Sequence, residues 1–194
     1  MFYKAARGFM WALMRLIYRF KVEGVQHIPQ TGAFILCSNH IHTLDPASHA
    51  TCIKRRVGFM GKIELYRNRF KRPFLKLLGV IPVNRGAADM KAYRATLEML
   101  NQGMGLFVFI QGTRLKEVEI KDAKGGAALF ALKAQVPLIP SCVVSTYGLF
   151  STIRIRYGPP IDLSQYKDQK LKSSVIDEVT ALLMEEVRKL CQGT

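Results

Sequence analysis

Apolar runs of strand length alternate with amphipathic segments along most of the chain, and this alternation limits the folds that it can adopt. The apolar runs predict buried strands at 33–37, 105–110 and 138–145, and an alternating segment predicts a half-exposed strand at 153–157. Helical spacing of apolar residues predicts helices at 89–100, 126–135 and 174–190. Interleaved strands and helices indicate an α/β fold with a mixed, mainly parallel sheet flanked by helices. In such a sheet, the turns that follow the strands meet at one edge, where ligands bind.

A single compact domain is expected over residues 22–194, preceded by a separate amphipathic helix over 1–21. The 194 residues suffice for one sizeable core, and a hydrophobic content of 49% excludes disorder. The four cysteines show no Cys-x-x-Cys spacing and fall mostly inside apolar runs, so we expect reduced, packed thiols of a cytosolic domain rather than a disulfide framework. These cysteines are Cys37, Cys52, Cys142 and Cys191.

A histidine and an aspartate lie five residues apart in the segment Asn39–Pro46, directly after the expected strand 33–37. A turn at the end of that strand can bring the carboxylate of Asp45 onto the imidazole of His40. A carboxylate that holds Nδ1–H of a neutral imidazole leaves Nε2 free to take a proton. The segment therefore predicts a general base, which needs no serine nucleophile if the substrate brings its own hydroxyl.

Two other interpretations of these residues remain open. Asp45 followed by Pro46 is typical of a helix start, so Asp45 could only cap a helix over 47–53. His42 adds a His-x-His pair that could bind a metal together with Asp45, although no further Cys/His cluster completes a ligand set.

Three further segments follow this motif in order. They are Gly79–Gly86, Phe109–Arg114 and Val136–Pro140. Together with Asn39–Asp45 they resemble the four sequence blocks of the glycerolipid acyltransferases, specifically the 1-acylglycerol-3-phosphate acyltransferase family. The resemblance covers residues 20–165, and four blocks in order at fitting separations are a more specific signal than any one of them.

The resemblance implies an O-acyltransferase in which His40 is the catalytic base and Asp45 its catalytic partner. It also implies substrate-binding roles for Asn39 of the same block, for residues in the other blocks and for two nearby lysines. These residues are Asn39, Arg85, Gln111, Gly112, Thr113 and Arg114, with Lys62 and Lys124 as additional candidates. The guanidinium groups of Arg85 and Arg114 suit a phosphate dianion, and backbone amides near Gly112 are expected to line an oxyanion hole.

One position departs from the family's pattern. The family usually has Phe-Pro-Glu-Gly-Thr-Arg in the third block, whereas this chain has Ile110 and Gln111 at the proline and glutamate positions. Glutamine keeps an acceptor and gains a donor, but it carries no negative charge. Gln111 therefore bears on the level of activity and on the choice of acceptor.

The charge of the chain points to an anionic partner, because 29 basic residues stand against 14 acidic ones and give a net charge of +15. No zinc-finger spacing or aromatic-interleaved RNA motif supports nucleic acid. Residues 2–20 instead predict a helix in the plane of a membrane surface, with packing on its own domain as the alternative. Arg7 and Arg15 interrupt any transmembrane span, and a signal peptide would need a cleaner apolar core. The segment 67–78 is a second candidate lipid contact.

Cations and large apolar side chains occupy opposite faces of this predicted helix. The basic face holds Lys4, Arg7, Arg15 and Arg19, and the apolar face holds Phe2, Phe9, Met10, Leu13, Leu16, Ile17 and Phe20.

The expected function is a membrane-associated acyltransferase that moves a fatty acyl group from acyl-CoA or acyl-ACP to the free hydroxyl of 1-acyl-sn-glycerol 3-phosphate, giving phosphatidic acid. No cofactor or metal is expected, since the thioester is a co-substrate. The expected partners are anionic membrane lipid, lysophosphatidic acid and the coenzyme A or acyl carrier protein thioester, at the cytoplasmic face of a membrane. The alternatives are transfer to another lysophospholipid or acyl acceptor, and a catalytically weakened lipid-binding homologue.

Overall fold

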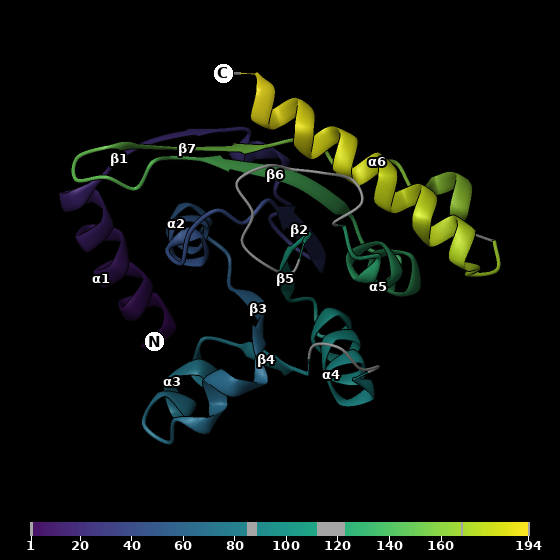
Figure 1. Ribbon diagram of the computed structural model, residues 1–194. Coiled ribbons are helices and arrows are strands. Elements are labelled where there is room, and N and C mark those ends of the chain that lie inside the picture. The colour runs from purple at the N-terminus through teal and green to yellow at the C-terminus, as the bar shows by residue number, and fades with distance from the viewer. Residues whose placement is uncertain (1, 85–88, 112–122, 168, 194) are drawn as a thin grey trace.

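A seven-stranded sheet forms the centre of the computed structural model, which describes residues 2–84, 89–111, 123–167 and 169–193 (Figure 1). The strands lie in the order β1-β7-β6-β2-β5-β3-β4. Neighbouring strands are parallel except β6 and β7, so the predicted mixed, mainly parallel sheet is confirmed. The bounds are β1 (Arg19–Glu23), β2 (Phe34–Ser38), β3 (Val57–Lys62), β4 (Val80–Val83), β5 (Gly105–Phe109), β6 (Leu138–Val144) and β7 (Thr152–Tyr157).

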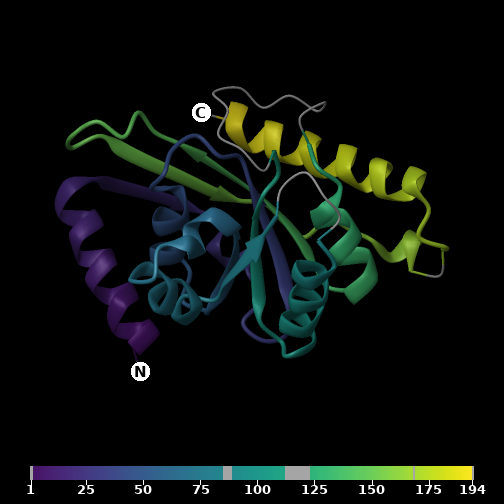
Figure 2. The ribbon, with the colours of Figure 1, turned by 60° about the horizontal axis from the view of Figure 1, so that its bottom comes forward.

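Helices cover both faces of this sheet, as Figures 1 and 2 show from two sides. The helices are α1 (Phe2–Ile17), α2 (Asp45–Cys52), α3 (Lys71–Leu77), α4 (Met90–Asn101), α5 (Gly126–Ala134) and α6 (Ser173–Gln192). Short 3-10 helices are η1 (Val25–His27), η2 (Ile63–Arg67) and η4 (Ser164–Tyr166). The helices predicted at 89–100, 126–135 and 174–190 are confirmed with ends that shift by one or two residues.

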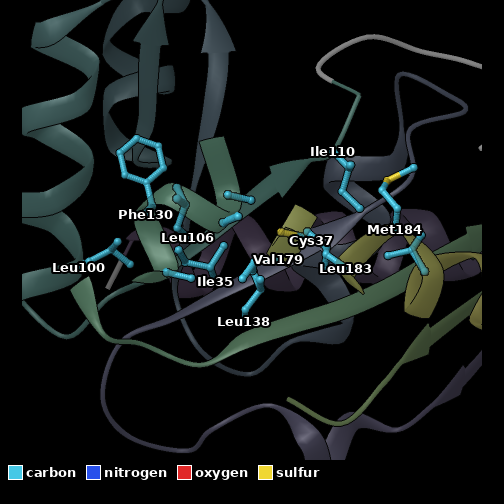
Figure 3. Packing of buried hydrophobic residues seen from close by; sticks show 14 of the residues in the cluster. Ile35, Cys37, Leu100, Leu106, Ile110, Phe130, Leu138, Val179, Leu183 and Met184 are labelled. Atoms are coloured by element: carbon cyan, nitrogen blue, oxygen red, sulfur yellow. The ribbon is translucent and has the colours of Figure 1, made fainter. Parts of the chain in front are cut away.

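The central strand β2 shows why helices cover both faces of the sheet. Its residues Phe34–Cys37 are fully buried and their side chains alternate between the two faces. Phe34 and Leu36 pack with α1 and α2, whereas Ile35 and Cys37 pack with α4, α5 and α6. Figure 3 shows the second cluster, in which Leu106 and Phe130 lie with Ile35. Burial of each large apolar side chain stabilises the fold by about 1.5–3 kcal/mol.

The amino-terminal helix is shorter than the segment 1–21 assigned to it. It ends at Ile17, and Arg19–Glu23 form the edge strand β1, which pairs in parallel with β7. The alternating exposure of β1 fits a strand, and its pairing with a strand 133 residues further on could not be seen from the local pattern. No helix among the described residues is long and apolar enough to span a membrane.

The expectation of four reduced thiols is wrong for two of the cysteines. Cys142 of β6 and Cys191 near the end of α6 form a disulfide, whereas Cys37 and Cys52 are free. A sequence without Cys-x-x-Cys spacing does not exclude this pair, because the packing of α6 on β6 brings the two residues together across 49 positions.

Candidate active site

His40 and Asp45 lie at the carboxyl end of β2, in the centre of the sheet. The loop 39–44 follows β2 directly and leads into α2, whose first residue is Asp45. This loop folds the carboxylate back onto the imidazole, so that His40 Nδ1 lies 2.7 Å from Asp45 Oδ2. The hydrogen-bonded pair predicted from the five-residue spacing is therefore present.

Four donors from the described part of the chain surround the carboxylate of Asp45, which is fully buried. The backbone amides of Ile41 and His42 donate to Oδ2 at 2.7 and 2.8 Å, as His40 Nδ1 does, and the hydroxyl of Tyr147 donates to Oδ1 at 2.5 Å. Burial would raise the pKa of Asp45, but the hydrogen bonds from His40, the two amides and Tyr147 outweigh it and lower the pKa below its usual value. Asp45 is therefore a carboxylate at neutral pH.

The N-cap interpretation of Asp45 does not agree with this geometry. The cap position of α2 is Leu44, and no side chain caps this helix end. Asp45 turns its oxygens away from the helix and onto the preceding loop, so its carboxylate orders the loop and the imidazole.

The imidazole of His40 is held on its face as well as at Nδ1. Its ring stacks on Phe109 of β5 with 3.9 Å between ring centroids and 16° between the planes. The side chain is 14% exposed, and no described residue hydrogen-bonds its Nε2. A fixed ring with Nε2 open to a substrate is the arrangement that a general base requires.

A buried polar network supports the strand end that carries His40. The side chain of Asn39 forms two hydrogen bonds with the backbone of Val143, at 2.9 and 2.8 Å, which join the ends of β2 and β6. Ser38 Oγ donates to Asn39 and lies 3.2 Å from Nε2 of the buried His49. Burial lowers the pKa of His49 to about 3, so it is neutral at pH 7. The predicted substrate role of Asn39 stays a prediction, since its amide is occupied in positioning the motif.

The other predicted substrate residues divide into two groups. Gln111 follows β5 and is buried, and its Oε1 has no hydrogen-bond partner among the described residues. Lys62 ends β3 and Lys124 precedes α5, and both side chains are exposed. The backbone amide of Lys124 donates to the carbonyl oxygen of Ile110 at 3.1 Å, so Lys124 lies near the carboxyl end of β5. Arg85, Gly112, Thr113 and Arg114 lie outside the described residues.

His42 has structural contacts in place of metal ligands. Its Nδ1 accepts a hydrogen bond from the amide of Leu44 at 3.2 Å, and its ring stacks on Tyr147. Within the described part of the chain, no group of three or more His, Cys, Asp or Glu residues could hold a metal ion. The His-x-His interpretation thus finds no support in the geometry.

Tyr147 is a site residue that sequence reasoning missed. It lies in the turn after β6, 102 positions from Asp45. A tyrosine in a Thr-Tyr-Gly turn gives no local signal of a contact with a distant carboxylate. The general rule that loops at the carboxyl ends of parallel strands converge was the one available clue.

An apolar cavity of about 320 Å³ lies beside the start of α2. Thr43 and Pro46, which flank Asp45, form part of its wall, and Met10 of α1, Met60 of β3 and Phe74 of α3 form other parts. A second cavity of about 550 Å³ has Asn39, His42 and Arg188 in its wall. The dyad thus has an apolar and a more polar hollow next to it.

Comparison with known proteins agrees with the motif and the fold. A model of the family described as Acyltransferase matches residues 19–144, more than half of the chain. The 1-acyl-sn-glycerol-3-phosphate acyltransferase of Streptococcus pneumoniae is 28% identical over 100% of this chain and 75% of that protein. The enzyme of the same name from Escherichia coli is 28% identical over 85% of this chain and 73% of that protein.

A solved structure shows the same fold. The crystal structure of the 1-acyl-sn-glycerophosphate acyltransferase PlsC from Thermotoga maritima matches with a TM-score of 0.75 and 20% identity. The match covers 99% of this chain and 80% of that one. With the His40–Asp45 pair at the carboxyl end of β2 and a family match across the four sequence blocks, the chain belongs to the acyltransferase family.

Proposed function

We propose that this protein transfers a fatty acyl group from a thioester to the free hydroxyl of 1-acyl-sn-glycerol 3-phosphate and so forms phosphatidic acid. The observation that carries the reaction type is the 2.7 Å contact between His40 Nδ1 and Asp45 Oδ2, with Nε2 free of any hydrogen bond from the described residues. The choice of acceptor is supported by the similar proteins, which are named for that acceptor.

The proposed reaction is one direct transfer. His40 Nε2 takes the proton of the acceptor hydroxyl as its oxygen attacks the thioester carbonyl carbon, and Asp45 stabilises the imidazolium that forms. The C–O bond forms, the C–S bond of the tetrahedral intermediate breaks, and the imidazolium returns the proton to the leaving thiolate. The products are an ester and a free thiol carrier, coenzyme A or acyl carrier protein.

The neighbouring nucleophiles support direct transfer over an acyl-enzyme. Cys37 is fully buried, and burial raises the pKa of its thiol far above the usual range. Ser38 is fully buried as well, and its hydroxyl is engaged with Asn39 and His49. Neither group can reach a bound thioester without a rearrangement of β2.

The apolar cavity beside Asp45 supports a lipid substrate. Its wall combines side chains of α1, α2, β3 and α3, and each methylene of an acyl chain transferred into such a wall gains about 0.8 kcal/mol. An acyl chain bound there would end next to the dyad, because Thr43 and Pro46 of the cavity wall lie on either side of Asp45 in the chain.

We further propose that α1 attaches the protein to an anionic membrane at its cytoplasmic face. Phe9, Leu13 and Leu16 form a stripe at helical spacing with exposed fractions of 72%, 40% and 76%. Beside them, the guanidinium of Arg15 lies 5.2 Å from the ring centroid of Trp11. A cation next to exposed apolar residues suits a surface of acyl chains and anionic headgroups.

The predicted faces of α1 need two corrections. Met10 was placed on the apolar face that would meet lipid, but it is half-buried and packs with the buried Met14 against the core. Arg7 was placed on the basic face, but its guanidinium donates to the carbonyl oxygen of Ile53 at 2.7 Å. The helix therefore both packs on the domain and exposes an apolar stripe. The side chains of Phe2 and Lys4 lie outside the described residues.

Two other exposed apolar groups support the same membrane face. Leu149 and Phe150 lie in the turn before β7, where the amide of Phe150 donates to Ile17 at the end of α1. Phe70 and Phe74 lie within the predicted contact 67–78, at the start and in the middle of α3.

Flotation with vesicles that contain phosphatidylglycerol tests this attachment. The variant Phe9→Glu/Leu13→Glu should lose most of its vesicle binding, whereas Met90→Glu, which changes an exposed residue on α4, should keep it. Raised salt should weaken binding without removing it, because apolar burial is not screened. Unchanged flotation of the double variant would contradict attachment through α1 and would favour attachment through the segment 67–78.

The acceptor is tested with a labelled acyl thioester and a panel of lysolipids. Transfer to 1-acylglycerol 3-phosphate should exceed transfer to acceptors that lack the terminal phosphate, and Arg85→Ala or Arg114→Ala should raise the KM for the phosphorylated acceptor far more than for the thioester. Equal activity with and without the phosphate would contradict the proposed acceptor. It would favour transfer to another acyl acceptor, a possibility that the uncharged Gln111 with its unpaired Oε1 also raises.

A further inference from the structure

The two oxygens of Asp45 have different partners. Oδ2 accepts from His40 and from two backbone amides, all of which belong to the loop 40–42. Oδ1 accepts from the hydroxyl of Tyr147, at 2.5 Å, and no second donor among the described residues reaches it. One oxygen is thus held by the motif itself, and the other by a residue 102 positions away.

The ring of Tyr147 is fixed on several sides. It stacks on His42 with 4.3 Å between centroids, and it meets Tyr18 edge-on at 5.9 Å. Its hydroxyl lies 3.2 Å from Ser48 Oγ, on the first turn of α2. These contacts aim the hydroxyl at the carboxylate and leave the ring little room to rotate.

The backbone of Tyr147 is in an unfavourable conformation. Its φ of +54° lies in the left-handed region, where a bulky non-glycine residue is rare. The amide of Tyr147 donates to Ser145 Oγ at 3.0 Å and so stabilises this turn. Residues held in such conformations concentrate at functional sites, where the surrounding structure imposes them.

We propose that Tyr147 is a positioning residue for the acyl transfer: its hydroxyl fixes the plane of the Asp45 carboxylate and thereby the orientation of the His40 imidazole. This proposal rests on the proposed function of the dyad. By sharing the negative charge of Asp45, the hydroxyl also sets how strongly the carboxylate holds a protonated His40.

Among the described residues, four ionisable side chains lie around Asp45. His40 and His42 face it from the loop, Tyr147 faces it from the turn after β6, and His49 lies one helical turn further along α2. His49 is neutral because it is buried. A change in the Tyr147 hydroxyl is therefore expected to act through the His40–Asp45 pair.

Tyr147→Phe tests the proposal, because it removes one oxygen and keeps the ring. We expect kcat to fall roughly tenfold to a hundredfold, the range for loss of a hydrogen bond to a charged group, with KM for both substrates within about twofold. The acid limb of the pH profile of kcat/KM should move to higher pH, since a carboxylate without this donor holds the imidazolium more strongly. Ser48→Ala, which removes the second contact of the phenol together with a hydrogen bond to the carbonyl oxygen of Leu44, should give a smaller change in the same direction.

Tyr18→Phe is the matched control. It removes a neighbouring phenol hydroxyl that has no contact with Asp45, so both kcat and the acid limb should stay at the wild-type value. Thermal unfolding of all three variants checks the fold. Unchanged kcat and an unmoved acid limb in Tyr147→Phe would overturn the proposal. A lower activity explained by lower thermal stability, with the acid limb of the pH profile unmoved, would overturn it as well.

A readout without substrate separates this proposal from the proposed function. The NMR titration of the His40 ring should shift to a higher midpoint in Tyr147→Phe and stay unchanged in Tyr18→Phe. If the wild-type protein fails to acylate 1-acylglycerol 3-phosphate but the titration shifts as expected, the proposed acceptor is wrong and the role of Tyr147 in positioning the dyad stands. An unmoved titration would contradict that role whatever the acceptor.

Discussion

Replacement of Asp45 by Asn removes one negative charge from the dyad and keeps nearly the same shape. The backbone amides of Ile41 and His42 converge on the position of Oδ2, so an NH2 group placed there would face two N–H donors. The carbonyl oxygen of Asn should therefore take that position and the NH2 group should face Tyr147, whose hydroxyl oxygen can accept. His40 then keeps a partner for Nδ1–H, and its Nε2 stays free.

The expected loss is consequently partial. The imidazolium that forms during transfer would face a neutral carbonyl group in place of a carboxylate, which at a charge separation of about 4 Å and an effective dielectric constant of about 20 costs up to about 4 kcal/mol. The neutral hydrogen bond that remains returns about 1 kcal/mol. A net loss of about 3 kcal/mol corresponds to a fall in kcat on the order of a hundredfold.

The assay is release of free thiol from the acyl thioester, followed at saturating acceptor, with Asp177→Asn as a control for an exposed aspartate on α6. The variant should remain folded, as circular dichroism would show. Turnover within about threefold of wild type would refute a charged partner for His40. Complete loss of activity in a folded variant would refute the predicted placement of the Asn oxygen. Loss of folding without a specific effect on kcat would show that Asp45 acts mainly by ordering the loop 39–44.

Three further predictions concern other parts of the molecule. His49 takes up a proton below its ordinary pKa of 6.5 in the unfolded state, but only near pH 3 in the folded state. The free energy of unfolding, measured by urea titration, should therefore fall by about 1.4 kcal/mol per pH unit between pH 6 and 4, and this slope should flatten in His49→Gln. If a charge is needed at position 111, Gln111→Glu should raise turnover on 1-acylglycerol 3-phosphate about tenfold, which corresponds to roughly 1.4 kcal/mol of transition-state stabilisation. A loss of activity on every lysolipid tested would show that Gln111 does not simply weaken the usual site. Thiol titration in denaturant should find two free cysteines, and reduction of the Cys142–Cys191 link should lower stability by about 4 kcal/mol on a chain-entropy basis; four free thiols without reductant would contradict the disulfide.

The sequence predicted features that depend on local patterns. The contact between His40 and Asp45 spans only five residues after a buried strand, so a turn was enough to foresee it. The fold class followed from the alternation of elements, because a strand such as β2 that is apolar on both faces must be covered by helices on both sides.

Features that depend on topology could not be predicted in the same way. The contacts of Asn39 with Val143 and of Asp45 with Tyr147 each cross more than 100 positions, and they exist because β2 and β6 are neighbours in the sheet. No spacing in the sequence shows which strands are adjacent.

The faces of α1 show a second limit. Met10 and Phe9 are adjacent and both apolar, yet Met10 is half-buried against the core and Phe9 is 72% exposed. Helical periodicity gives the angle between two side chains but does not show which apolar sector meets the domain. For the same reason Arg7, on the predicted basic face, lies against the end of α2.

The role of His40 as the base is the central claim, and comparison of wild-type protein with His40→Ala tests it most directly. Both proteins would be given a labelled acyl thioester and 1-acylglycerol 3-phosphate, with phosphatidic acid measured as the product. We predict that His40→Ala abolishes transfer while thermal unfolding and vesicle binding stay as in wild type. Near-normal formation of phosphatidic acid by His40→Ala would contradict the mechanism.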